Sequence, residues 1–305
     1  MTPRSAAPTP SPPTESAADA VVDAAGDGDY ESVQAAIDDS PTDGSGYVVY
    51  IRAGTYKEQL EVGDKRSNVT LVGEDVAETV LTWDENAEDA GGTTDSASVT
   101  VLADGFRAYD LTFQNTARPI AQKVALLAEG DRHVYANCRF LSHQDTLYTR
   151  ESGNRQYFRD CYVEGTTDFV FGDASAVFDR CEVFCLEGAS HVTAANTLPE
   201  YDVGLVFKHC RVHGDADEGS VDLGRPWGKH ARTVFVDCHL GEVIAPYGWS
   251  NWGDPSKEDT VYYAECANTG PGFTPEQRVE WAHVLAPERA GEFRDIFADW
   301  EPIEG

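Results

Sequence analysis

Six short stretches of the chain share one pattern of apolar and polar positions around a cysteine. An aromatic residue stands three positions before each cysteine, a polar residue stands one position before it, and in five of the six copies an apolar residue follows two positions later. The cysteines are Cys138, Cys161, Cys181, Cys210, Cys238 and Cys266, and the aromatic residues are Tyr135, Phe158, Phe178, Phe207, Phe235 and Tyr263. This alternation predicts half-buried strands in which the cysteine and the residue two positions beyond it face inward.

The cysteines are separated by 23, 20, 29, 28 and 28 residues, which is an internal repeat. The same phase occurs earlier at 110–113 and 68–71, so about eight or nine repeats are present. Repeats of this length that carry short strands predict an all-β parallel β-helix, in which each coil covers the apolar face and edge of the next. A propeller needs about 40 residues per blade and is excluded on that ground. The cysteines are then expected to form an interior column of free thiols.

Both ends of such a stack need covers. Helical spacing of apolar residues after Asp29 predicts a short helix over 29–39 that closes the first coil. The segment 274–285 begins with Thr274 and Pro275, a capping pattern that predicts a second helix. Its apolar residues Val279, Trp281 and Val284 are expected to pack on the last coil.

The chain is predicted to hold one domain. Residues 1–26 are rich in Pro, Ser, Thr and Ala and are expected to form a disordered tail. Residues 27–305 are expected to form the β-helix domain with its C-terminal helical cap. A monomer is expected.

The chain carries 53 acidic against 23 basic residues, a formal net charge of −30. Nucleic acid is therefore an unexpected partner. Such an excess is typical of proteins that work in high salt, and an ordinary acidic surface is the alternative. No stretch of about 18 apolar residues predicts a membrane span, and no secretory signal is visible. An odd count of seven cysteines and eight histidines without ligand spacing predict no metal and no cofactor.

Two aspartates occupy equivalent positions in adjacent repeats. Asp145 lies seven residues after Cys138, and Asp168 lies seven residues after Cys161. Coils repeat at about 4.8 Å, so the two carboxyl groups are expected to lie roughly 5 Å apart along the stack. One of them is then driven toward protonation, while a cation can keep the other charged. A structural ladder of turn aspartates is the alternative, although the FVF run after Asp168 is unlike an ordinary turn.

Five segments, in this order, resemble one family, the pectin methylesterases or pectinesterases. They are GTYKE (54–58), QKVALL (122–127), HQDTLY (143–148), GTTDFVFG (165–172) and LGRPWG (223–228). The resemblance covers roughly residues 27–300 and implies a single-stranded right-handed parallel β-helix, in agreement with the repeat. It also implies an aspartyl esterase that removes methyl esters from polygalacturonate, giving methanol and pectate, in pectin catabolism or cell wall modification.

The resemblance implies a role for each matching site residue. Asp168 corresponds to the nucleophile, and Asp145 corresponds to the general acid that later acts as a base. Gln122 and Gln144 correspond to amide donors for the oxyanion, and Arg225 corresponds to the cation that orients the nucleophile.

Sugar rings have apolar faces, so aromatic residues near these groups are expected to bind the substrate. Trp227, Phe171 and Tyr148 are the candidates, with Trp252 a weaker one. The implied partner is methylesterified polygalacturonate or an oligogalacturonate. The sequence departs from the family pattern at Lys123, where alanine is common.

Two other functions remain open at this stage. A polysaccharide hydrolase or lyase can use paired carboxylates on the same kind of β-helix. A sugar-binding β-helix without catalysis belongs to a different class of function. Location also stays open, because secretion would suit a pectin substrate although the sequence shows no export signal.

Overall fold

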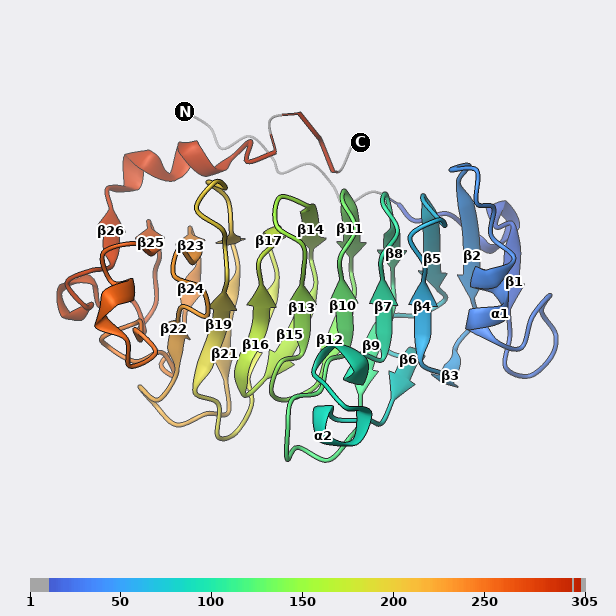
Figure 1. Ribbon diagram of the computed structural model, residues 1–305, viewed down its shortest axis with the longest axis horizontal. Helices are drawn as coiled ribbons and strands as arrows, with labels where there is room; N and C mark the ends of the chain where they lie inside the picture. Colours follow the sequence, from blue (N-terminus) through green and yellow to red (C-terminus); the bar gives the residue numbers. More distant parts are fainter. Residues whose placement is uncertain (1–10, 298, 303–305) are drawn as a thin grey trace.

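The protein is a long coil of parallel strands stacked along one axis, as the computed structural model in Figure 1 shows. The structure describes residues 11–297 and 299–302. The strands of these residues fall into three parallel sheets, here called A, B and C, and the successive coils run from β1 at one end to β26 at the other. The predicted all-β fold, a right-handed parallel β-helix, is confirmed.

Each sheet takes one strand from most coils. Sheet A contains β1 (Ala20–Val22), β2 (Tyr47–Ile51), β5 (Val69–Gly73), β8 (Arg107–Tyr109), β11 (His133–Ala136), β14 (Arg155–Arg159), β17 (Ser175–Asp179), β20 (Leu205–Lys208), β23 (Arg232–Val236), β25 (Tyr262–Cys266) and β26 (His283–Leu285). Sheet B contains β3 (Gly54–Lys57), β6 (Thr79–Trp83), β9 (Thr112–Asn115), β12 (Arg139–Leu141), β15 (Tyr162–Gly165), β18 (Glu182–Cys185), β21 (Arg211–Gly214) and β24 (His239–Leu240). Sheet C contains β4 (Leu60–Val62), β7 (Val99–Val101), β10 (Leu126–Ala128), β13 (Leu147–Thr149), β16 (Thr167–Gly172), β19 (His191–Ala195) and β22 (Asp222–Gly224).

Helices are short and lie outside the coils. The α-helices are α1 (Val33–Asp38) and α2 (Ala87–Ala90). The 3-10 helices are η1 (Glu15–Ala17), η2 (Thr94–Ser96), η3 (Pro255–Lys257), η4 (Pro275–Gln277) and η5 (Pro287–Phe293). Within the described residues, no helix has the length and apolar character that crossing a membrane requires.

The predicted strand around each cysteine is in fact two strands joined by a bend. The polar residue before the cysteine has a left-handed backbone, with φ of 52° at Asn137, 52° at Asp160 and 57° at Arg180. The strand of sheet A ends just before this residue, and the strand of sheet B begins just after the cysteine. Asn and Asp are the non-glycine residues that adopt this conformation most readily, which explains why the position is polar.

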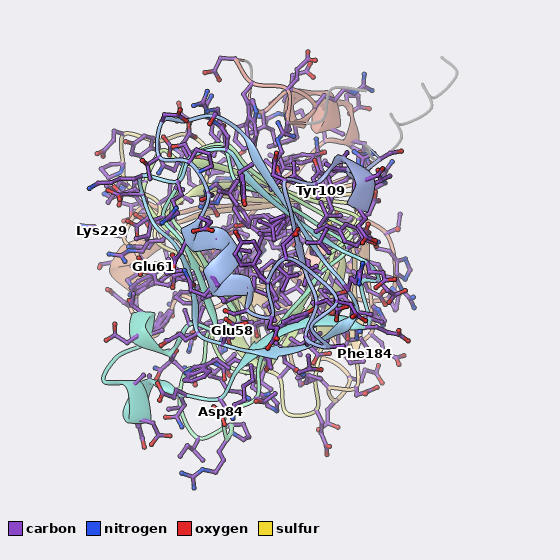
Figure 2. All side chains as sticks on the ribbon, turned by 90° about the vertical axis from the view of Figure 1, so that its right-hand side faces the viewer. Glu58, Glu61, Asp84, Tyr109, Phe184 and Lys229 are labelled. Carbon is purple, nitrogen blue, oxygen red and sulfur yellow. The ribbon has the colours of Figure 1, made fainter. Side chains whose placement is uncertain are left out.

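Stacked side chains fill the centre of the coil, as the view along the axis in Figure 2 shows. Phe158, Phe178, Phe207 and Phe235 stack in order, with ring centroids 4.6, 4.5 and 4.5 Å apart. Trp249 then stands between Phe235 and Tyr263 and continues the stack toward the last coil. Each aromatic ring covers the next, so these coils share one continuous core.

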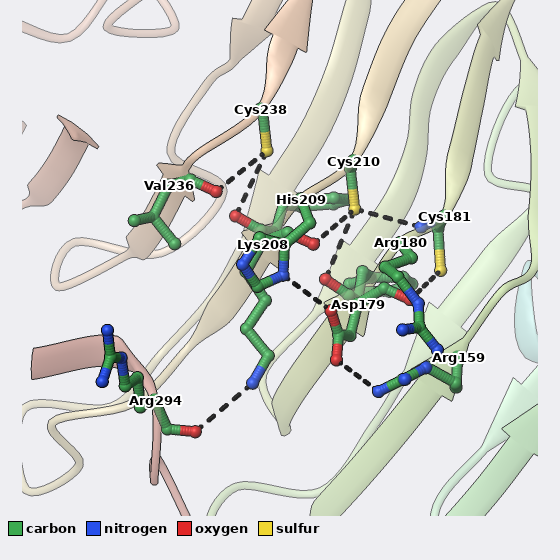
Figure 3. Close-up of polar contacts among 12 residues, drawn as sticks. Arg159, Asp179, Arg180, Cys181, Lys208, His209, Cys210, Val236, Cys238 and Arg294 are labelled. Carbon is green, nitrogen blue, oxygen red and sulfur yellow. Dashed lines mark hydrogen bonds and ion pairs between the residues drawn. The ribbon is translucent and has the colours of Figure 1, made fainter. Parts of the chain in front are cut away.

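The repeat cysteines form the predicted interior column. All seven cysteines of the chain are buried free thiols. Cys181, Cys210 and Cys238 direct their sulfur atoms at carbonyl oxygens of the neighbouring coil, those of Phe158, Phe178 and Phe207, at 3.4 to 3.5 Å. Figure 3 shows these three cysteines on successive coils. The thiols therefore pack as small apolar groups that also satisfy backbone acceptors.

The N-terminal cover differs from its prediction at two points. The composition predicts a disordered tail over residues 1–26, but β1 lies in this range and pairs with β2, so the β-helix begins there. Residues 1–10 of the predicted tail lie outside the described part of the chain. The helix starts later than predicted, because Asp29 is bonded to Val21 through both its backbone N–H and its carboxylate. Ser32 caps α1 instead, and the helix buries Val33, Ala36 and Ile37 against the first coil.

The predicted C-terminal helix over 274–285 is wrong. Only η4 forms, and the chain then extends into β26, which pairs with β25. Arg278 explains the change, because its guanidinium is buried against Glu265 and the carbonyl oxygens of the last coil, which holds the backbone extended. Trp281 packs on the core as expected, whereas Val284 is 44% exposed.

Replacing one ring of the interior stack is expected to destabilise the protein strongly. Phe178→Ala removes a fully buried ring that contacts rings on both sides and should cost about 3 to 5 kcal/mol of unfolding free energy. The matched control is Phe184→Ala, on the half-buried outer face of β18 (Figure 2), which should cost about 1 kcal/mol. Denaturant unfolding at fixed salt measures both, and equal losses would contradict the stacking account.

Candidate active site

A cleft lies on the outer face of sheet C, with a volume of about 420 Å³. Its lining brings together every residue that the sequence predicts for the site. The lining residues are Thr93, Thr94, Gln122, Gln144, Asp145, Tyr148, Asp168, Phe171, Ala194, Arg225, Trp227 and Trp252. These residues span 160 positions in the sequence, so the coil stacking creates the cleft.

The two aspartates lie at matching positions of neighbouring coils. β13 pairs with β16 so that Leu147 faces Val170, and each aspartate stands two residues before its member of this pair. The backbone N–H of Asp145 also donates to the carbonyl of Thr167 over 3.1 Å. The two aspartates therefore lie on neighbouring coils, which repeat at about 4.8 Å, and both line the same cleft.

Both aspartates have a left-handed backbone, with φ of 63° at Asp145 and 51° at Asp168. Such a conformation costs a non-glycine residue on the order of 1 to 3 kcal/mol and is enriched at functional sites. At Asp168 it coincides with a register shift between β16 and β19. The strained bend interrupts the strand alternation and places the carboxylate in the cleft.

Arg225 holds Asp168 in a buried, two-pronged ion pair. Its Nε donates to Oδ1 over 2.9 Å, and its Nη2 donates to Oδ2 over 2.7 Å. The Asp168 side chain is only 6% exposed. On its other side the guanidinium lies over the ring of Trp252, 3.9 Å from the centroid. Because two N–H groups and an aromatic face fix the guanidinium, the carboxylate has a defined orientation.

Among the residues that the structure describes, no arginine or lysine forms an ion pair with the carboxyl group of Asp145. Burial, followed by the negative charge of Asp168, raises the pKa of Asp145 to about 8, while Arg225 and the Gln144 amide oppose the rise. Asp145 is therefore a carboxylic acid at neutral pH and can donate a proton. Two identical residues thus supply an acid and an ion-paired carboxylate, as the spacing predicts.

The two glutamines are fixed at the same edge of the cleft. The N–H of Lys123 donates to the Gln144 carbonyl over 3.1 Å, which ties together the main chains that carry the two amides. The N–H of Ala87, at the start of α2, donates to the Gln122 carbonyl over 2.8 Å. Side-chain amides positioned in this way can donate to an oxygen that gains negative charge.

Aromatic side chains form one wall of the cleft. Tyr148 and Phe171 are partners in the β13–β16 register and stack with centroids 4.2 Å apart. The ring centroid of Trp227 lies 6.2 Å from that of Tyr148 and 6.1 Å from that of Phe171, and Trp227 is 43% exposed. A planar apolar ring of a ligand fits such a wall.

Some features lie elsewhere or were not predicted. Glu58 of the GTYKE segment caps α1 through Ser32, Val33 and Gln34, so it belongs to the N-terminal cover. Thr93 and Thr94 enter the cleft from the excursion that carries α2 and η2, and no motif marks them. Within residues 11–297 and 299–302, no group of three or more His, Cys, Asp or Glu residues is arranged to hold a metal ion.

Comparison with known proteins gives one consistent result. The family model of Pectinesterase matches residues 19–295. Pectinesterase 2 of Citrus sinensis is 38% identical over 291 residues, which is 90% of this chain and 56% of that protein. The chain spans about half the length of the curated relatives that it matches, 47% to 60% for three of them.

Solved structures agree with the family match. The pectin methylesterase from carrot superposes with a TM-score of 0.86 at 34% identity, covering 93% of each chain. A second pectin methylesterase, in complex with a hexasaccharide, has a TM-score of 0.82 at 26% identity and covers 94% of this chain and 99% of its own.

Removing the Asp145 carboxyl group is expected to change how stability depends on pH. Its folded pKa of about 8 is raised above the unfolded value of about 3.9, so its contribution is complete below pH 4 and is lost as pH rises to about 8. The stability of Asp145→Asn relative to wild type should therefore increase from pH 4 to pH 8 and level off above. Denaturant unfolding across this range measures it, and a difference that does not vary with pH would refute the assignment.

Proposed function

Because the chain belongs to the pectinesterase family, we propose that it hydrolyses methyl esters of polygalacturonate, releasing methanol and leaving pectate. The observation that carries the proposal is the Arg225–Asp168 ion pair beside the protonated Asp145. The biological role that follows is pectin breakdown or cell wall modification. One chain supplies all the groups that this reaction needs, and we propose that the enzyme is a monomer.

The first half of the reaction transfers the galacturonosyl acyl group to the enzyme. Asp168 attacks the ester carbonyl carbon, and the amides of Gln122 and Gln144 donate to the oxygen that becomes negative. As the tetrahedral intermediate collapses, the bond to the methoxy oxygen breaks and Asp145 gives that oxygen its proton. Methanol leaves, and the sugar carboxyl remains joined to Asp168 as an anhydride.

The second half reverses the proton transfer. Asp145, now a carboxylate, takes a proton from a water molecule whose oxygen attacks the anhydride. The bond to Asp168 breaks, and the sugar leaves as a free carboxylic group while Asp145 is again protonated. All atoms and protons are accounted for by one water molecule consumed and one methanol released.

The charges of the site explain how one carboxyl group serves in both halves. The negative charge of Asp168 raises the pKa of Asp145 in the free enzyme, whereas Arg225 lowers it. Acylation removes the Asp168 charge and leaves Arg225 without its partner. Both changes lower the pKa of Asp145, so the group that was an acid becomes able to remain ionised and act as a base.

The substrate is proposed to lie along the outer face of sheet C. Trp227 and the stacked pair Tyr148–Phe171 present apolar faces beside the reacting groups. A solved pectin methylesterase in complex with a hexasaccharide supports an oligosaccharide as the ligand. The side chains of this wall can pack on sugar rings while the carboxyl ester points at Asp168.

Incubating the purified protein with methylesterified polygalacturonate is expected to release methanol without shortening the chains. Asp168→Asn should lower the rate by about a thousandfold or more, because it removes the nucleophile. The matched control is Asp237→Asn, an exposed bend residue whose φ of 52° nearly equals the 51° of Asp168, and it should keep full activity. Chain shortening, or an unchanged rate in Asp168→Asn, would overturn the proposal.

Salt is expected to raise the activity. A net charge of −30 repels a substrate that already carries free carboxylates, and the Debye length falls from about 10 Å at 0.1 M to about 3 Å at 1 M salt. The ratio kcat/KM should therefore rise with salt on partly demethylated chains and change less on fully esterified, neutral chains. Activity that is highest in dilute buffer on both substrates would contradict this expectation.

A further inference from the structure

Lys123 is a buried ammonium next to Gln122, which lines the cleft, and the proposed reaction does not use it. The residue is 2% exposed. The Nζ atom donates to the carbonyl oxygens of Ala117 over 2.7 Å and of Asn115 over 3.3 Å. A buried charge is costly unless such contacts compensate it, so its presence here calls for a function.

The bonds of Lys123 join the segments that carry the two glutamines. Its N–H donates to the Gln144 carbonyl over 3.1 Å, and its own carbonyl accepts from Ser142 Oγ over 2.7 Å. These contacts fix the main chain on the side of Gln144. The ammonium group bonds to the carbonyls of Asn115, at the end of β9, and of Ala117, so it fixes the main chain that precedes Gln122.

The segment 116–121 leads from β9 to Gln122. Thr116, at its start, donates to the Trp83 carbonyl through both its N–H and its Oγ1, and beyond Thr116 the bonds of the segment, apart from the Lys123 contact, are local. Ala117 N–H donates to Asn115 Oδ1 over 3.0 Å, and Ile120 N–H donates to the Arg118 carbonyl over 2.8 Å. Ile120 is 57% exposed. The contact between Lys123 and Ala117 thus joins an exposed turn to the interior of the protein. This turn precedes Gln122, whose side-chain amide is proposed to donate to the oxyanion.

We propose that Lys123 is a positioning residue, a buried clasp that holds the 116–121 turn and thereby keeps the Gln122 amide aimed into the cleft. It touches neither the substrate nor the reacting atoms. Because its role is to place an oxyanion donor, this inference rests on the proposed esterase function. A misplacement of about 1 Å in such a donor can cost about a hundredfold in rate.

The strength of the Lys123 hydrogen bonds is expected to depend on pH, because its amine can lose its charge. Burial lowers the pKa of Lys123 to about 8, and the Glu164 carboxylate on β15 opposes this shift. His143, in the turn before β13, is the other titratable group that interacts with it, and its pKa is lowered by burial and by the Lys123 charge. Above pH 8 the clasp becomes a neutral amine and a weaker donor, so the turn loosens.

The test compares Lys123→Met, which keeps the length and loses the donors, with Lys123→Arg, which keeps the charge above pH 8. Lys57→Met, at an exposed lysine paired with Asp84, is the control for lysine loss. Lys123→Met should lower kcat about 10- to 100-fold with KM within about twofold, and Lys123→Arg should restore part of kcat and extend it above pH 8. A purely structural role would lower stability without this split of kcat from KM or the change in the pH profile.

Hydrogen exchange of residues 116–122 supplies a readout independent of the reaction. Exchange should speed up in Lys123→Met and stay at the wild-type rate in Lys57→Met. If the wild-type protein releases no methanol, the esterase proposal fails. The exchange rates still test whether Lys123 holds the 116–121 turn. Wild-type kcat in Lys123→Met, or unchanged exchange in that variant, would overturn the inference.

Discussion

The structure depends on the register in which the coils stack. Parallel pairing at about 4.8 Å places residues of equal phase on top of one another, and this holds for the aromatic stack, the cysteine column and the two aspartates alike. The spacing is small enough that two buried carboxyl groups cannot both carry a charge at low cost. The chemistry of the site follows from this constraint, because Arg225 pairs with one aspartate and leaves the other to hold its proton.

A left-handed bend recurs along the coil and serves two purposes. At Asn137, Asp160 and Asp237 it turns the chain from sheet A to sheet B, in an exposed or half-exposed position where the polar side chain is solvated. At Asp145 and Asp168 the same backbone conformation occurs at the entrance to sheet C, where the side chains are buried in the cleft. The left-handed bend that turns the chain between sheets thus also places the two carboxyl groups. Lys123 stabilises the 116–121 turn through its bond to the Ala117 carbonyl.

Periodicity in the sequence predicted most of the fold and the pairing of Asp145 with Asp168, whereas the other residues of the cleft were predicted from the resemblance to the pectinesterase family. The 20- to 29-residue repeat is enough to stack Asp145 on Asp168, whatever the shapes of the intervening loops. The terminal elements were harder, since tertiary contacts overrode local signals: buried Arg278 extends a segment with a helical capping pattern, and Asp29 bonds to β1 instead of capping α1. Thr93 and Thr94 were missed, because only the path of an irregular excursion brings them to the cleft.

The central claim is that Asp145 carries a proton at neutral pH beside an Asp168 that is ion-paired with Arg225. Infrared difference spectroscopy of carboxyl groups tests it most directly, since a protonated carboxyl has a C=O band that a carboxylate lacks. The wild-type spectrum should contain such a band from the cleft at pH 7, the band should disappear in Asp145→Asn, and it should fade in wild type as pH rises through about 8. A band that disappears in Asp168→Asn but persists in Asp145→Asn would contradict the account.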